Sequence, residues 1–200
     1  MKLITARKTS IDSDPIHLAV LDFWFGPEPG VARAEWFRKD AAFDEEIRRR
    51  FGSVHAAAAA RELEAWRMSP EPMLALVIVL DQFSRNLHRG DARAFAQDAH
   101  ALECAKQAVA RKDDMGLLPV QRQFVYLPYE HSESLADQEI GVELMRSLDA
   151  FEETRGVSEW AVKHRDIIAR FGRFPHRNAA LGRASTPEEA EFLLQPGSSF

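Results

Sequence analysis

Apolar residues recur along this chain at the three- and four-residue spacing that is typical of amphipathic helices. Phe43, Ile47 and Phe51 repeat every four residues, and a second apolar stripe runs from Trp160 to Phe171. Such spacing gathers apolar side chains on one helix face, where they pack inward. Because no segment shows the sustained alternation of a half-buried strand, the pattern predicts an all-α chain of about nine or ten helices. Successive helices of similar length, joined by short loops, suit antiparallel hairpins stacked one on another.

Capping residues mark the ends of the predicted helices. A side-chain oxygen just before a helix accepts hydrogen bonds from its first backbone N–H groups, and five residues have that position: Asp14, Asp40, Ser134, Ser158 and Thr186. The last of these opens the sequence Thr-Pro-Glu-Glu, which predicts a capping box with proline in the first turn. Gly52 and Gly172 are expected to end helices, because glycine adopts the left-handed conformation without steric penalty.

The most apolar stretch, MLALVIVL at residues 73–80, permits two interpretations. As a buried parallel strand it would place Asp81 at its carboxyl end, where open α/β sheets bind ligands. As a helix it would be hydrophobic on all sides and therefore central. Neither glycine nor proline interrupts residues 73–88, and Gly90 then supplies a stop, so we expect a central helix. On that helix Asp81 and Arg85 share a face.

The composition fits one globular domain. The chain has 200 residues, of which 46% are hydrophobic and 28% are charged, close to the average for a single domain with a sizeable core. We expect a flexible leader at residues 1–13, one helical domain at residues 14–195 and a loose tail at residues 196–200.

Charge and cysteine content exclude several classes of function. The net charge of −5 and the pI near 5.8 give no electrostatic footprint for nucleic acid or an acidic membrane, so any anion site must be local. Cys104 is the single cysteine, which excludes an internal disulfide and a cysteine-based zinc site. The N-terminus lacks a signal-peptide pattern, and no apolar stretch approaches the ~20 residues of a membrane span, so we expect a cytoplasmic protein.

The segment HRDIIARFGRFPHRN at residues 164–178 holds four arginines and two histidines against one acid. The helix dipole stabilises basic residues in a last helical turn, so a purely structural role explains one or two of these arginines. The excess of guanidinium and imidazole groups also suits an anion. Crowded arginines need negative charge nearby, and we expect it from Asp81, Glu133 and Asp166 or from a bound anion.

Three polar groups interrupt or follow apolar helices, and they hold the candidate site residues. The first is Asp81, Arg85 and Asn86; the second is His131, Glu133 and Gln138; the third is His164, Arg170, Arg173, His176, Arg177 and Asn178. If the groups converge, they form a concave pocket, and we expect Asp81, His131 and Arg173 to border one cavity. The local alternatives are an intrahelical ion pair for Asp81 and Arg85 and a hydrogen-bonded core position for His164.

Motifs for other chemistries are missing from the sequence. His131, Glu133, His164 and His176 offer the nitrogen and oxygen ligands of a mixed metal site, but no HExxH or HxH spacing supports one. No serine lies in a nucleophile elbow, and the isolated glycines form neither a P-loop nor a dinucleotide fingerprint. We therefore expect no metal and no cofactor.

Three longer motifs carry a family resemblance. They are LDQFSRN at 80–86, LPYEHSESLADQE at 127–139 and RFGRFPHRNAALGRASTPEE at 170–189. With them the chain resembles, from about Ile16 to Leu194, the uncharacterised bacterial family catalogued as domain of unknown function 924. The resemblance implies an all-helical, tetratricopeptide-like right-handed array and brings no established activity. The chain departs from the family pattern at Ser84, where proline is usual, and at Tyr129-Glu130, where an apolar pair is usual.

Two functions from different classes are consistent with these residues. The first is a protein whose basic pocket binds a small carboxylate or phosphate ligand, with His131, His176 or Asp81 as acid or base if there is turnover. The second is an adaptor that binds a peptide or protein partner in a helical groove, as tetratricopeptide-like folds commonly do. Polar residues gathered in one deep site favour the first function, and a long open groove favours the second. No nucleic acid or membrane partner is expected.

Overall fold

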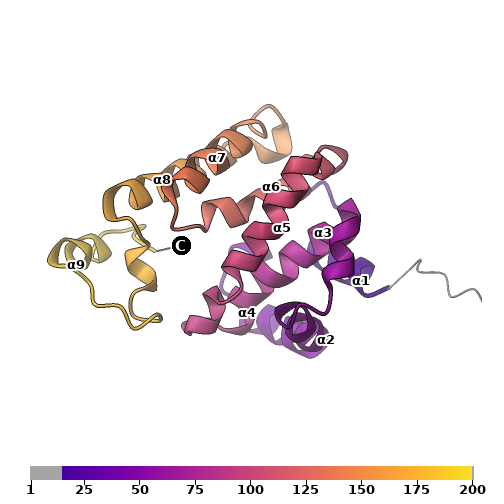
Figure 1. The fold of residues 1–200 in the computed structure, drawn as a ribbon, viewed down its shortest axis with the longest axis horizontal. Coiled ribbons are helices and arrows are strands. Elements are labelled where there is room, and N and C mark those ends of the chain that lie inside the picture. Colours follow the sequence, from indigo (N-terminus) through magenta and orange to yellow (C-terminus); the bar gives the residue numbers. More distant parts are fainter. Residues whose placement is uncertain (1–14, 200) are drawn as a thin grey trace, which may run out of the picture.

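The structure, a computed structural model, describes residues 15–199. These residues are helical and contain no strand, which confirms the all-α prediction (Figure 1). The α-helices are α1 (Pro15–Phe25), α2 (Ala41–Ala59), α3 (Pro70–Val77), α4 (Ser84–Leu87), α5 (Asp98–Arg111), α6 (Pro119–Glu130), α7 (Leu135–Arg146), α8 (Val157–Phe171) and α9 (Pro187–Leu193). Because a π-helical segment joins α3 to α4, the described part of the chain has eight continuous helices, close to the predicted number.

The predicted central helix is confirmed. It consists of α3, the π-helical segment Ile78–Phe83 and α4, and every residue from 73 to 84 is buried. α1, α5 and α6 pack against α3, while α2 packs against the π-helical segment and α4. A π-helical segment widens the turn and shifts the side chains that follow, and such segments are frequent at functional sites. Here the widened turn carries Asp81.

Aromatic side chains form much of the core on the α1 side of this helix. Trp24 contacts Phe83 and Phe124 edge-on, with ring centroids 5.7 Å and 5.5 Å apart. Trp36, in a short 3-10 turn before α2, donates its indole N–H to the carbonyl oxygen of Trp24 at 2.8 Å. Edge-on contacts are favourable because they place the positive ring edge against the negative ring face.

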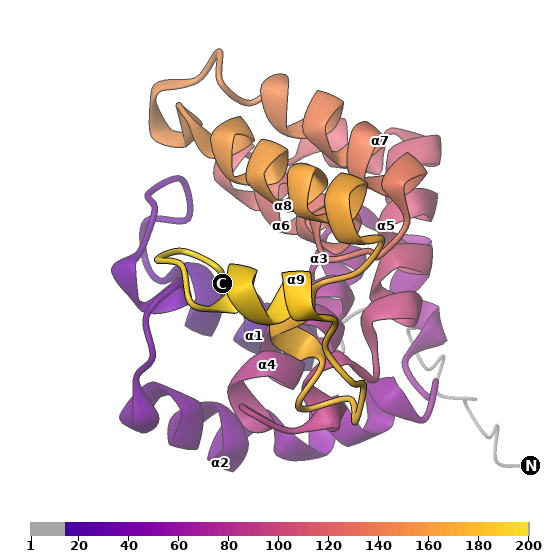
Figure 2. The same cartoon turned by 90° about the vertical axis from the view of Figure 1, so that its left-hand side faces the viewer.

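The C-terminal segment has a small core of its own. Ile167, Ile168 and Phe174 are buried together, and Phe171 and Phe192 pack against them. In Figure 1 this segment lies at the left-hand end of the molecule, next to the end of α8, and in Figure 2 the same end faces the viewer. The chain reverses there because Gly172 adopts a left-handed conformation with φ of 68°, as predicted for the end of this helix.

Most predicted caps are confirmed. Asp40 accepts hydrogen bonds from the backbone of α2, Ser134 accepts one from the backbone of α7, and Thr186 forms the predicted capping box of α9. Asp14 and the leader at 1–13 lie outside the described residues. In the tail at 196–199, Ser198 is buried and donates to the carbonyl oxygen of Leu193 at 3.1 Å.

Two helix boundaries were predicted wrongly. α2 continues through Gly52, where an end was expected, because buried Phe51 and His55 on either side hold the helix against the core. Their packing outweighs the cost of about 1 kcal/mol for glycine in a helix interior. Ser158 is not the cap of α8; Gly156 precedes that helix, and the Ser158 hydroxyl donates to Asp149 at 2.5 Å. No helix in the described range is long and apolar enough to cross a membrane.

Gly141 allows α7 to approach α6 closely. A Cβ atom at this position would lie 3.0 Å from the Cβ of Tyr129 and 3.5 Å from backbone atoms of α6. We expect Gly141→Ala to lower the free energy of unfolding by about 1–3 kcal/mol through overpacking, although alanine is the better helix former. The control is Gly52→Ala, where nothing lies within 4 Å, and where a gain of up to about 1 kcal/mol is expected in urea denaturation. Equal gains for both variants would contradict the close approach.

Candidate functional site

Asp81 and His131 contact each other although fifty residues separate them in sequence. Asp81 is 1% exposed on the π-helical segment, and His131 immediately follows α6. The Nδ1 atom of His131 lies 2.8 Å from Asp81 Oδ1. Gln82 donates to Asp81 Oδ2 at 2.6 Å, and Arg85 Nη1 lies 3.2 Å from Oδ1. The first two predicted polar groups therefore meet, through Asp81 and Arg85 of the first group and His131 of the second.

The charges around Asp81 fix the state of the His131 imidazole. Burial alone would raise the pKa of Asp81, but Arg85 and His131 hold this pKa well below its ordinary value, so Asp81 is ionised. Burial and then Arg85 lower the pKa of His131 below its ordinary value, against the opposing effect of Asp81. His131 is thus neutral near pH 7 and donates Nδ1–H to Asp81. Its Nε2 makes no hydrogen bond with the described residues.

Arg85 connects this pair to a second carboxylate, Asp98. Arg85 forms a two-pronged ion pair with Asp98, at 3.0 Å and 3.1 Å, and donates to the Asp81 carbonyl oxygen at 2.8 Å. Arg177 donates Nη1–H to the same Asp98 carboxylate at 3.0 Å. Asp98 was predicted only as the start of a helix. Nothing local marks it as a site residue, because its partner Arg177 lies 79 residues away.

Arg177 is buried with most of its donors unused. Its guanidinium carbon lies 4.7 Å from the ring centre of Phe95 and 4.5 Å from that of Phe174. Nη1 alone donates to a carboxylate, and the buried Nε has no hydrogen-bond partner. Burial lowers the pKa of Arg177 to about 10, because Asp98 and the other nearby carboxylates do not fully compensate the charge. The ring contacts hold the guanidinium in place without using its N–H groups.

Glu130 and His164 form a buried pair beside His131. His164 Nδ1 lies 2.8 Å from the Trp160 carbonyl oxygen and 3.1 Å from Glu130 Oε1, and the His131 and His164 rings are 6.3 Å apart. Burial raises the pKa of Glu130 to about 8, with a contribution from Asp81, and lowers the pKa of His164 to about 3. At neutral pH both are therefore uncharged. His164 occupies the hydrogen-bonded core position that was its local alternative.

His176 lies within reach of the same charges. Burial, together with the nearby Arg177, His131 and Arg85, lowers the pKa of His176 to about 4. Its ring centre is 5.5 Å from that of Phe174. His176 is therefore a neutral imidazole near pH 7, and it lies close to Arg85 and Arg177.

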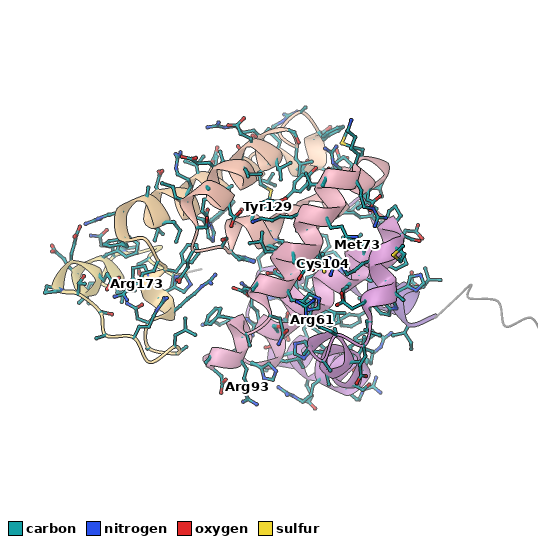
Figure 3. The ribbon with its side chains drawn as sticks, viewed as in Figure 1. Arg61, Met73, Arg93, Cys104, Tyr129 and Arg173 are labelled. Atoms are coloured by element: carbon teal, nitrogen blue, oxygen red, sulfur yellow. The ribbon has the colours of Figure 1, made fainter. Side chains whose placement is uncertain are left out.

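Arg170 and Arg173 of the 164–178 segment have carboxylate partners in the first turn of α9. Arg173 forms a two-pronged ion pair with Glu189 at 2.6 Å and 2.8 Å, and Arg170 pairs with Glu188. The expectation that Asp81, Glu133 and Asp166 compensate the crowded arginines is corrected for Arg170 and Arg173, because the first-turn acids of α9 pair with them. Asp166 pairs with Arg165 instead, at 2.7 Å. Figure 3 shows Arg173 in the C-terminal segment, away from Tyr129 in the body. Asp81 and His131 therefore converge with Arg177. Arg173, which was expected beside them, pairs with Glu189 instead.

The remaining predicted ligand-binding residues make internal hydrogen bonds. Glu133 accepts from Phe174 N at 2.8 Å and pairs with Arg183 at 2.7 Å, which ties the C-terminal segment to the body. Gln138 donates to the backbone carbonyls of residues 130 and 132. Asn178 binds Ser185 and Glu189, and Asn86 binds Asp44. These contacts stabilise the structure around the site. Arg183 takes part in them and was not among the predicted residues.

The cluster is partly open to solvent. The side chains of Arg85, Asp98 and His131 are 21%, 18% and 14% exposed. Two cavities lie elsewhere: one of about 390 Å³ is bordered by Asn86 and residues of α2, and one of about 900 Å³ lies between α5, α6 and α7. Asp81, His131, Arg173 and Arg177 border neither. Any ligand of the cluster therefore reaches it through the exposed edges of these side chains.

The buried contact between Ser84 and His55 does not form a serine nucleophile. His55 Nε2 lies 2.8 Å from Ser84 Oγ, and Ser84 Oγ donates to the Leu80 carbonyl oxygen at 2.5 Å. Because the hydroxyl proton is used there, His55 must be the donor and cannot act as a base for Ser84. Within residues 15–199, no group of three or more histidine, cysteine or acidic side chains is arranged to hold a metal ion.

The chain belongs to the family of bacterial proteins of unknown function DUF924, whose family model matches residues 20–197. The structure of a protein of unknown function, ATU0120 from Agrobacterium tumefaciens, is similar to it, with 41% sequence identity and a TM-score of 0.79. The match covers 91% of this chain and 98% of that one. No curated protein matches the chain.

Proposed function

We propose that the cluster formed by Asp81, Arg85, Asp98, His131 and Arg177 binds a small anion, a carboxylate or a phosphate, in a cytoplasmic protein. The observation that carries this proposal is the set of spare N–H donors on the buried Arg177 guanidinium. The Nε2 lone pair of His131 is also unused, and it can accept a proton from a ligand hydroxyl or acid. A carboxylate or phosphate is the acceptor that a guanidinium fork binds best. An anion would also compensate the buried charge of Arg177.

The same arrangement supports acid–base chemistry on the bound anion. Asp81 holds His131 through Nδ1–H, which leaves the Nε2 lone pair as the base and stabilises the imidazolium that forms when Nε2 takes a proton. The imidazolium of His131 then returns this proton to the product, because His176, with a pKa of about 4, is unprotonated at neutral pH and has none to give. His131 is the proposed general base, Asp81 orients it, and Arg85 and Arg177 are the proposed ligand-binding residues.

The test is a thermal-shift measurement with inorganic phosphate and with succinate, against sodium chloride at equal ionic strength. A ligand present at 100 times its Kd stabilises the folded state by about 2.7 kcal/mol, which corresponds to a Tm rise of roughly 5–10 °C for a chain of this size. We expect such a rise with at least one of the two anions, and its loss in Arg177→Lys, which keeps the charge but lacks the fork.

Arg173→Ala is the matched control, because Arg173 is bound by Glu189 and Ala184 outside the cluster. It should lower the Tm in every buffer and keep the anion-dependent rise. No rise with either anion, or a rise that Arg177→Lys retains in full, would contradict the proposal.

The adaptor function and the tetratricopeptide-like arrangement of the helices remain our second proposal. The groove between α5, α6 and α7 supports it as an open, largely apolar surface. Against it, Asn86 and Asn178, which a peptide backbone would need as partners, are engaged by Asp44 and by Glu189. The anion site is therefore the function that we favour.

A further inference from the structure

A groove of about 900 Å³ runs over α6, with α7 as one wall and the end of α5 with the following 3-10 turn as the other. It lies apart from the proposed anion site, since neither Asp81 nor His131 borders it. Its apolar lining includes Val109, Met115, Ile140 and Leu144. α6 packs against both α5 and α7, and Figure 1 shows α7 and α6 in the upper part of the molecule with α5 below them.

The apolar side chains at the rim of this groove face solvent. Met115 is 62% exposed and Ile140 is 47% exposed, on opposite walls. The polar groups of the floor are already satisfied, because the Tyr126 hydroxyl donates to Asp114 at 2.5 Å and accepts from Arg122 at 3.1 Å. A charged small molecule would therefore find few partners on the floor, whereas an apolar surface would gain by covering both walls.

Two charged residues at the rim lack an ion-pair partner among the described residues, and they have opposite signs. Lys112 stands on the α5 wall and Glu139 on the α7 wall, and both are exposed. The neighbouring acid Glu143 is different, since it pairs with Arg146. A partner helix of one charge would be attracted by one wall and repelled by the other. A surface that presents the same two charges in reverse order would match both.

From this we propose that the groove is the interface between two copies of this chain. In a two-fold arrangement the same patch meets itself, so that Lys112 of each copy faces Glu139 of the other, and the pair occurs twice. Met115 and Ile140 then cover each other's apolar surface at the centre. The matched rim charges set the register, and the apolar walls supply the driving force.

The test is the mass of the full chain in solution, measured by light scattering after size exclusion over a range of concentrations. We expect twice the 22.6 kDa of one chain for the wild type. Lys112→Glu and Glu139→Lys should each place like charges together twice and shift the protein to the monomer. The double variant Lys112→Glu with Glu139→Lys should restore the dimer, because it exchanges the two charges.

Lys39→Glu makes the same charge change at an exposed lysine outside the groove and should leave the dimer intact. Far-ultraviolet circular dichroism and the Tm of each single variant show whether the chain is folded. A wild type that stays monomeric at every concentration overturns the proposal. So do folded single variants that remain dimeric, or a double variant that stays monomeric. None of these outcomes bears on the anion-dependent Tm rise, which reports the other site.

Discussion

Replacing Asp81 with alanine is expected to lower the free energy of unfolding by about 3–5 kcal/mol, because it leaves two buried hydrogen-bond donors unpaired and removes one of the two carboxylates that compensate Arg85. Asp81 is almost fully buried and receives hydrogen bonds from Gln82 and His131 as well as the charge of Arg85. Its removal leaves two donors unpaired on the central helix and at the end of α6. Urea denaturation at pH 7 measures the change.

Asp91→Ala is the matched control. Asp91 also forms a two-pronged ion pair with an arginine, Arg93, but on the surface, where their side chains are 44% and 68% exposed. Exposed pairs contribute little because solvent screens them, so this variant should cost much less than Asp81→Ala. If Asp81→Ala costs no more than Asp91→Ala, Asp81 does not hold the cluster together.

Replacing Glu130 with glutamine is expected to change how stability depends on pH. Burial raises the pKa of Glu130 to about 8, above its ordinary value of 4.5. The unfolded chain therefore releases this proton at lower pH than the folded chain does, and stability is lost as the pH rises towards 8. Between pH 6.5 and 8 the wild type should lose about 2 kcal/mol from this group, while Glu130→Gln, which is neutral at every pH, should lose none of it.

The buried histidines act in a different pH window. The pKa values of His164 and His176 lie at about 3 and 4, below the ordinary 6.5, so their contribution to stability is present above pH 6.5 and is lost as the pH falls. Denaturation curves from pH 6.5 to 8 thus isolate Glu130. Glu143→Gln, an exposed acid on α7, serves as the control and should follow the wild type. Parallel curves for the wild type and Glu130→Gln would show that Glu130 is ionised in the fold.

Helix positions were predictable from sequence because their determinants are local. Asp40 caps α2 through the backbone of residues 42 and 43, and Thr186 and Glu189 cap α9 within one turn. The central helix followed from an uninterrupted apolar run. Gly52 and Ser158 misled the prediction because packing and a distant carboxylate, rather than the local sequence, determine their structure.

The site was predictable only in part. Asp81, His131 and Arg177 stood out because charged groups interrupt apolar or turn segments there. Asp98, which connects Arg85 to Arg177, did not stand out, because no local sequence pattern relates it to either arginine. The pairing of Arg173 with Glu189 was closer to being predictable. The capping box predicts that the Glu189 carboxylate turns back towards the start of α9, but it does not predict which arginine lies there.

The most direct test of an anion beside His131 is an NMR titration of its imidazole against pH, with and without inorganic phosphate at constant ionic strength. Without phosphate the pKa of His131 should lie below its ordinary value, because burial and Arg85 disfavour the charged ring. With phosphate it should rise, since a negative charge near Nε2 stabilises the imidazolium. The rise should disappear in Arg177→Lys. Identical titration curves for His131 with and without phosphate would contradict the proposed anion site.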